Sequence, residues 1–180
     1  MRLSPDQRGV VIGGLKGVAV ALVLGIPAYG LARAMGQGPP PDMDAGERLA
    51  FAVRWDVPLL IWLAACVRRV SSGRFRSPAD IGGSAFAQPS AAIAVPRAVL
   101  QNSLEQVVLA VGAHLALAVV LRGAELLALP VLVGLFLAGR VWFALGYARG
   151  APGRAPGMVL TAAPTFAALL LAGVLALSGR

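Results

Sequence analysis

Five long stretches of this chain carry no charged side chain, and short segments rich in arginine, glycine and proline separate them. A helix needs roughly 20 mainly apolar residues to cross the hydrocarbon core of a bilayer, so each stretch can anchor one crossing. The charge-free stretches are 17–32, 57–67, 106–121, 126–139 and 155–179. The pattern therefore predicts five transmembrane helices, at about 10–34, 50–70, 98–121, 125–147 and 157–178.

The composition agrees with an all-α integral membrane protein. Of the 180 residues, 58% are hydrophobic and 13% are charged, and the mean hydropathy is +0.77. These values are unusual for a soluble domain. The first apolar stretch is too long for the apolar region of a signal peptide, so we expect a retained helix. A Gly- and Pro-rich segment, 36–44, follows it, and we divide the chain into an N-terminal helix with its connector, 1–48, and a four-helix domain, 49–180.

The arginines are distributed unevenly between the two ends of the predicted helices. With five crossings, one side holds nine of them and the other holds three, which predicts a cytoplasmic N-terminus and an outer C-terminus in a bacterial inner membrane. The net charge of +8 is thereby explained by topology, and we expect no nucleic-acid partner. The nine are Arg2, Arg8, Arg68, Arg69, Arg74, Arg76, Arg97, Arg149 and Arg154; the three are Arg48, Arg122 and Arg180.

Two clusters of polar residues lie at helix ends on the predicted cytoplasmic side. On the third helix Arg97, Gln101 and Glu105 follow one another at four-residue intervals, and Asn102 lies three before Glu105, so they share one broad face. A charged group at membrane depth costs about 2.5–3.5 kcal/mol, so such a cluster is usually held by a ligand or a partner helix. The second cluster consists of Arg140, Tyr147, Arg149 and Arg154. We interpret the two clusters as one site, in which Glu105 binds a ligand ammonium or pairs with Arg140 or with an arginine at the end of the second helix.

The connections between the predicted helices differ in length. The segment 122–124 is short and predicts an antiparallel hairpin of the third and fourth helices. The segment 148–156 predicts a loop that carries Arg149 and Arg154. The segment 71–96 is longer than an ordinary connector and is a candidate lid.

The remaining polar residues in the predicted spans favour structural roles. His114 lies nine residues after Glu105, on the opposite side of its helix, which indicates a hydrogen bond between helices. Arg54 and Asp56 are expected to face the first helix, with its Lys16. The chain shows no metal-ligand spacing and no phosphate-binding loop, so we expect no metal.

Three segments together resemble the MAPEG family, the membrane-associated proteins of eicosanoid and glutathione metabolism. They are 97–105 (RAVLQNSLE), 138–140 (AGR) and 146–154 (GYARGAPGR). The resemblance covers about 50–178 and implies a four-helix subunit, a homotrimer in membrane lipid, and glutathione sites between neighbouring subunits. The helix at about 10–34 is an addition to this scheme.

The resemblance also implies roles for individual residues. Arg154 matches the arginine that faces the glutathione sulfur, and a guanidinium there would favour the reactive thiolate. Gln101 shares the face of the third-helix residues and is included with those expected to hold glutathione. These residues are Arg68, Arg69, Arg97, Gln101, Asn102, Glu105, Arg140 and Tyr147.

The sequence thus predicts a membrane enzyme that transfers glutathione, its co-substrate, to apolar electrophiles or reduces lipid hydroperoxides. Phe143, Leu100 and Gln106 replace polar or aromatic residues of leukotriene C synthase, which argues against leukotriene synthesis. The alternative is a non-catalytic lipid- or partner-binding membrane protein on the same scaffold. A third hypothesis, a transporter with Glu105 and Asp56 as relay carboxylates, needs an internal repeat that the sequence does not show.

Overall fold

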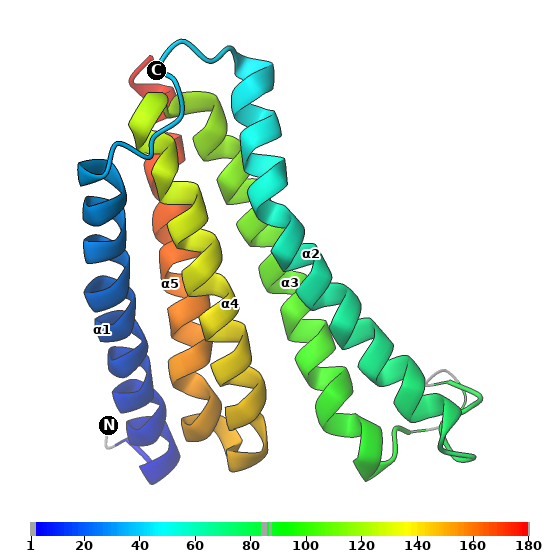
Figure 1. Cartoon of the computed structure of the whole chain (residues 1–180). Helices are drawn as coiled ribbons and strands as arrows, with labels where there is room; N and C mark the ends of the chain where they lie inside the picture. The colour runs from blue at the N-terminus through cyan, green and yellow to red at the C-terminus, as the bar shows by residue number, and fades with distance from the viewer. Residues whose placement is uncertain (1–2, 84–85, 87, 180) are drawn as a thin grey trace.

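The computed structural model describes residues 3–83, 86 and 88–179, and within them it consists of helices and connecting turns (Figure 1). The long helices are joined by two short 3₁₀ segments and two longer connections. In chain order the elements are α1 (Pro5–Ala34), α2 (Ala45–Phe75), α3 (Ala91–Val120), η1 (Gly123–Leu127), α4 (Ala128–Gly146), η2 (Tyr147–Arg149) and α5 (Gly150–Leu177).

The five predicted helices are all present. Four helical stretches are long and apolar enough to cross a membrane, and the last, Gly123–Leu177, contains both α4 and α5, between which the chain turns back at η2. The chain therefore runs along the bundle five times. The N-terminus and the α2–α3 and α4–α5 turns lie at one end, which we call the N-terminal end (Figure 1). Arg33, at the end of α1, belongs to the opposite end and adds a fourth arginine to the three counted there.

Several helices begin earlier than the apolar pattern predicts, because polar caps and prolines start them. Ser4 and Asp44 form capping boxes with Gln7 and Glu47, and each side chain satisfies a backbone N–H that the first helical turn leaves free. Pro5 occupies the first turn of α1, where its missing N–H costs nothing. The polar flanks of the apolar stretches are thus helical too.

The α2–α3 connection is shorter than predicted, because 71–75 continue α2 and 91–96 already belong to α3. Ser90 donates its backbone N–H to Asp80 Oδ1 (2.9 Å) and its hydroxyl to Asp80 Oδ2 (2.6 Å). Hydrogen bonds from Ser77, and then from Ser90, hold the pKa of the Asp80 carboxyl below its ordinary value. The described part of the predicted lid is thereby tied to the start of α3, and Ser84, Ala85 and Ala87 lie outside the described residues.

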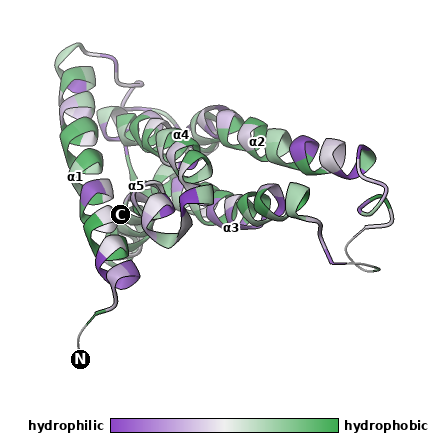
Figure 2. Ribbon diagram, turned by 90° about the horizontal axis from the view of Figure 1, so that it is seen from below, coloured by the Kyte–Doolittle hydropathy of each residue, from purple (hydrophilic) through white to green (hydrophobic). Residues whose placement is uncertain are grey.

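The helices form two pairs and one flanking helix. α2 packs along α3, α4 packs along α5, and α1 packs against α5 on the side away from α2 and α3 (Figure 2). α3 and α4 run antiparallel as predicted but touch little, because α5 packs against both. The core runs the length of the bundle between α2, α3, α4 and α5, with Leu59, Leu117 and Phe136 almost fully buried.

Most of the outer surface is apolar. Large hydrophobic side chains such as Ile26, Ile61 and Leu170 are exposed on α1, α2 and α5, which suits contact with lipid. The view along the bundle shows hydrophobic colouring over much of the helix surfaces (Figure 2). Polar colouring in that view gathers towards helix ends and turns.

Buried polar contacts hold α2 to α3. Asp56 Oδ1 and His114 Nδ1 lie 2.5 Å apart, both residues being almost fully buried, which confirms the predicted role of His114. Asp56 therefore faces α3 and not α1, so that part of the prediction is wrong; Arg54 and Lys16 are exposed. At the end of the bundle opposite the N-terminal end, the buried Arg48 donates to the carbonyl oxygens of Ala118 (2.9 Å) and Val119 (3.2 Å). A guanidinium at these carbonyls satisfies the free acceptors at the end of α3.

Candidate functional site

Glycines allow α4 and α5 to approach each other closely at the N-terminal end. A Cβ on Gly157 would lie 2.6 Å from the carbonyl oxygen of Gly139 and closer still to the amide nitrogen of Phe143. A Cβ on Gly146 would similarly overlap the backbone of Gly153. Since only glycine fits these positions, the backbones touch, and side chains from both helices converge beside the contact.

Arg140 of α4 lies inside this contact and is fully buried. Its Nη1 donates to Asn102 Oδ1 of α3 (2.8 Å) and its Nε donates to Thr161 Oγ1 of α5 (3.1 Å). Its guanidinium carbon lies 4.4 Å from the centre of the Phe143 ring, a cation–π distance. All of these partners are neutral, so in the described chain the buried charge has no carboxylate within hydrogen-bonding distance.

A pocket of about 370 Å³ opens beside Arg140, between α3, η2 and α5. Asn102, Tyr147 and Arg154 contribute its polar side chains. The Arg154 guanidinium carbon lies 4.5 Å from the centre of the Tyr147 ring, and that ring packs edge-on against Phe143. Arg154 belongs to the second turn of α5 and not to a loop, so its backbone is fixed by the helix.

The first turns of α1 also reach this pocket. Val10 lines it, and a Cβ on Gly9 would lie 2.8 Å from Pro152 at the start of α5. Further along, Gly13 and Gly17 are buried against α5. The added helix is therefore part of the wall of the pocket.

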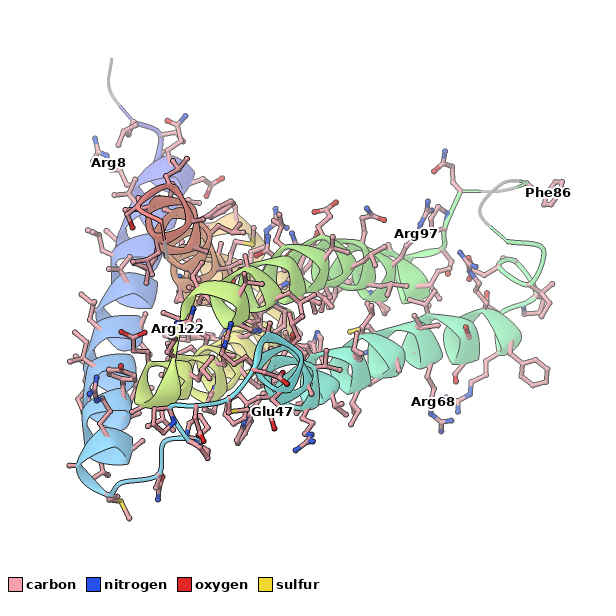
Figure 3. All side chains as sticks on the ribbon, turned by 90° about the horizontal axis from the view of Figure 1, so that it is seen from above. Arg8, Glu47, Arg68, Phe86, Arg97 and Arg122 are labelled. Atoms are coloured by element: carbon pink, nitrogen blue, oxygen red, sulfur yellow. The ribbon has the colours of Figure 1, made fainter. Side chains whose placement is uncertain are left out.

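The structure brings four of the predicted residues together, Asn102, Arg140, Tyr147 and Arg154, and leaves the others on the outer surface. Gln101 Nε2 donates to Glu105 Oε1 (3.0 Å) on an exposed face of α3. Glu105 therefore does not pair with Arg140, contrary to one of the expectations for it. Arg68 and Arg97 are exposed and lie on opposite sides of the α2–α3 pair (Figure 3).

Arg69 lines a second, smaller cavity. This cavity of about 140 Å³ lies between α2, α3 and α4, and Trp62, Cys66 and Pro96 also line it. In one subunit, Arg69 and Arg154 therefore belong to different pockets. The predicted single site is divided between an inner cluster around Arg140 and an outer set on α2 and α3.

Some polar contacts near the site were not predicted. Trp62 Nε1 donates to the buried Ser103 hydroxyl (3.1 Å), and the Cys66 thiol lies 3.9 Å from the same oxygen. Thr161 and Met158 of α5 contact Arg140. The four-residue spacing of Gly153 and Gly157, and the spacing of Gly139 and Gly146 by seven, were the available signals for this helix contact.

Chemically, the pocket suits an anionic ligand with an apolar partner. It has the charge of Arg154 at its surface, the charge of Arg140 behind it, an amide, a phenol and an apolar wall. Guanidinium groups bind carboxylates and stabilise thiolates. Among the described residues no group of three or more His, Cys, Asp and Glu side chains is placed to hold a metal ion.

Comparison with known proteins gives one result. The family model described as MAPEG family matches residues 49–174, which is more than two-thirds of the chain. The chain belongs to the MAPEG family. Searches of curated proteins and of solved structures gave no match.

Membership of the family accounts for the arrangement of the core helices in this MAPEG protein. The matched region begins within the first turns of α2 and ends near the end of α5, so it contains the four helices that form the core, together with the inner cluster. α1 lies outside the match, in agreement with the prediction of an added helix. Its four long apolar helical stretches and its family identify the chain as an integral membrane protein.

Proposed function

We propose that this MAPEG protein is a glutathione-dependent membrane enzyme that transfers glutathione to apolar electrophiles or reduces lipid hydroperoxides. The observation that carries the proposal is a pocket lined by Arg154, with the buried Arg140 behind it and hydrogen-bonded to the pocket residue Asn102. Among the described residues neither guanidinium has a carboxylate partner. Glutathione carries two carboxylates and a thiol, and such a pocket suits both the carboxylates and the thiolate.

In this proposal Arg154 activates the thiol. A free thiol has a pKa near 8.5, so only a few per cent is thiolate at neutral pH. A guanidinium beside the sulfur favours the charged form and remains protonated itself. Stacking on Tyr147 fixes the direction in which the Arg154 side chain points, and Asn102, which lines the pocket, is held in place by its hydrogen bond from Arg140.

We further propose that the complete site is shared between subunits of a homotrimer. Glu105 lies halfway along α3 on an exposed face, and a carboxylate in that position is costly in contact with lipid. A neighbouring subunit that covers this face would remove the cost. It would also bring the residues of the outer set that lie on the covered face, Gln101 and Glu105 among them, towards a ligand in the pocket of its neighbour.

The test is the ultraviolet absorbance of the thiolate on mixing detergent-purified protein with glutathione near pH 7. We expect a thiolate signal in the wild type and its loss in Arg154→Ala. Arg149→Ala is the matched control, since Arg149 is an exposed arginine on η2 that does not line the pocket. Arg154→Lys keeps the charge without the planar guanidinium, and we expect an intermediate signal.

Two outcomes would contradict the proposal. A thiolate signal that persists in Arg154→Ala would remove the role assigned to this residue. No signal in the wild type, together with no glutathione binding by calorimetry, would favour a non-catalytic binding protein on the same scaffold.

A further inference from the structure

A long apolar groove lies between α1 and the α4–α5 pair, away from the pocket described above. α1 and α5 touch near Gly13 and Gly17, and beyond this contact the groove is lined by α1 residues from Val18 to Tyr29 and by α5 residues from Ala163 to Leu175. The groove has a volume of about 720 Å³ and ends beside η1. Tyr29 and Glu125 are the polar residues among those that line it, and both lie at this end.

A basic hollow continues the groove at its η1 end. Arg33 and Arg122 line this hollow, of about 390 Å³, and Glu125 lines both the hollow and the groove. Arg33 Nη1 also donates to the Tyr29 hydroxyl (3.3 Å), which links the two spaces from the side of α1. Both arginines are exposed, and with Glu125 they give the hollow a formal charge of +1 (two positive, one negative).

We propose that this groove binds one anionic phospholipid, with an acyl chain between α1 and α4–α5 and the phosphate at Arg33 and Arg122. Three features carry the proposal. The groove is apolar and open to the bilayer along the exposed face of α1. The charge lies only at the helix ends, where a headgroup lies when its chain is in the membrane. Two guanidinium groups around one hollow complement a phosphate, with which arginine forms paired hydrogen bonds.

The added helix is what makes this site. The side of the groove opposite α4 and α5 consists of α1 residues such as Leu22 and Ile26, and one of the two arginines is on α1. The matched MAPEG region, 49–174, supplies only the other side. The lipid site is therefore distinct from the proposed glutathione site and does not depend on it.

The test compares phosphatidylglycerol with phosphatidylcholine of identical acyl chains. Binding to the full-length protein in detergent micelles is measured by native mass spectrometry and by the shift in thermal unfolding. We expect the anionic lipid to bind about tenfold more tightly, and Arg33→Gln/Arg122→Gln to abolish the difference. Arg8→Gln/Arg76→Gln, which removes two exposed arginines from the opposite end, should retain it.

Two further variants keep the test decisive. Arg33→Lys/Arg122→Lys preserves the charge and should retain most of the preference for phosphatidylglycerol. This variant can still be measured if the double glutamine variant fails to fold. Ala163→Phe places a ring in the groove and should weaken binding of both lipids. Equal binding of the two lipids by the wild type, an equal loss in the Arg8/Arg76 control, or unchanged binding in Ala163→Phe would each overturn the proposal. Release of bound lipid upon self-association would show instead that a second copy occupies the groove.

Discussion

Arg140 shows how a single charge can organise the interior of this membrane protein. Among the described residues it is the largest fully buried side chain, and it connects α3 to α5 through Asn102 and Thr161. Its neutral partners spread the charge without cancelling it, so the pocket beside it remains attractive to an anion. Retaining a buried, uncompensated charge is costly for folding, and a ligand that brings negative charge would relieve that cost.

Asn102 is the partner of Arg140 whose loss should be easiest to measure. In Asn102→Ala the Nη1 group loses its acceptor, and we expect a loss of about 1.5–3 kcal/mol in the free energy of unfolding, as for other hydrogen bonds to charged groups. Denaturation of the protein in mixed micelles measures this loss in the free energy of unfolding. Gln101→Ala, on the exposed face one residue earlier, should change stability by about 0.5 kcal/mol or less. Equal losses in the two variants would contradict the structural role of Asn102.

Asp80 should make the α2–α3 connection sensitive to acid. Its folded-state pKa is lowered, so its hydrogen bonds stabilise the fold above the ordinary carboxyl pKa of about 3.9, and this contribution is lost as the pH falls through the lowered value. We expect hydrogen exchange at the Ser90 amide, taken relative to its intrinsic rate at each pH, to accelerate below about pH 4. In Asp80→Asn it should be fast at every pH.

Asp42→Asn is the control for this experiment, because Asp42 is an exposed carboxylate in the connector between α1 and α2. Its exchange profile at Ser90 should match that of the wild type. An acid-induced acceleration that survives in Asp80→Asn would assign the effect to another group.

For individual side chains, the sequence predicted which residues belong to polar clusters better than it predicted which residues they contact. Helix periodicity placed Asn102 and Glu105 on one broad side of α3, but a side that wide includes both a half-buried position, Asn102, and an exposed one, Glu105. Which of the two reaches Arg140 depends on the rotation of α3 relative to α4 and α5, and packing among three helices decides that rotation. Similarly, Asp56 and His114 lie 58 residues apart, and periodicity alone does not pair them.

The α4–α5 pair is the element on which the inner cluster depends. Its backbones meet at Gly139, Gly146, Gly153 and Gly157, and this contact places Thr161 against Arg140 and Arg154 over Tyr147. In lipid, where apolar burial gives little drive, such backbone contact is a main source of helix association. The geometry of the pocket is therefore set by residues that have no side chain.

We expect Gly157→Ala to push α4 and α5 apart and to destabilise the fold by about 1–3 kcal/mol, the usual cost of overpacking. Gly173→Ala, in the same helix but with no atom within 4 Å of the added Cβ, should be neutral or slightly stabilising. Thermal unfolding in detergent measures both. Similar shifts of the two variants in the same direction would show that helix propensity, and not contact, decides the effect.

Helix number and order could be predicted from the apolar pattern, and helix ends could not. The pattern reports where lipid covers the chain, whereas capping boxes and the helical turns around Pro96, Pro152 and Pro156 extend the helices beyond it. For the same reason, the segment with Arg149 and Arg154 was predicted as a loop although α5 begins at Gly150.

For the whole molecule, the proposed trimer has a specific consequence. If Arg69 of one subunit and Arg154 of the next serve one ligand, then variants of the two residues should complement each other. Co-expressed Arg69→Ala and Arg154→Ala subunits that assemble at random would leave about a quarter of the shared sites intact, so about a quarter of wild-type thiolate formation should return. Light scattering should give a protein mass of about 55 kDa, three times 18.4 kDa.

The control for complementation is co-expression of Arg154→Ala with Asn102→Ala. Asn102 and Arg154 line the same pocket of one subunit, so no mixture of these chains restores a site. Recovery in this control, or none in the Arg69/Arg154 mixture, would place the whole site within one subunit.

The position of α1 has a consequence for biosynthesis. α1 is synthesised well before α5, yet its close contact is with that helix: Gly13 touches Ala155. At about 5–20 residues per second, the ribosome adds the intervening 142 residues (155 minus 13) in roughly 7–28 s. During that interval the glycine surface of α1 lacks the helix on which it packs in the folded protein. Lipid or a membrane chaperone must cover it until α5 is synthesised, so completion of α5 completes this contact.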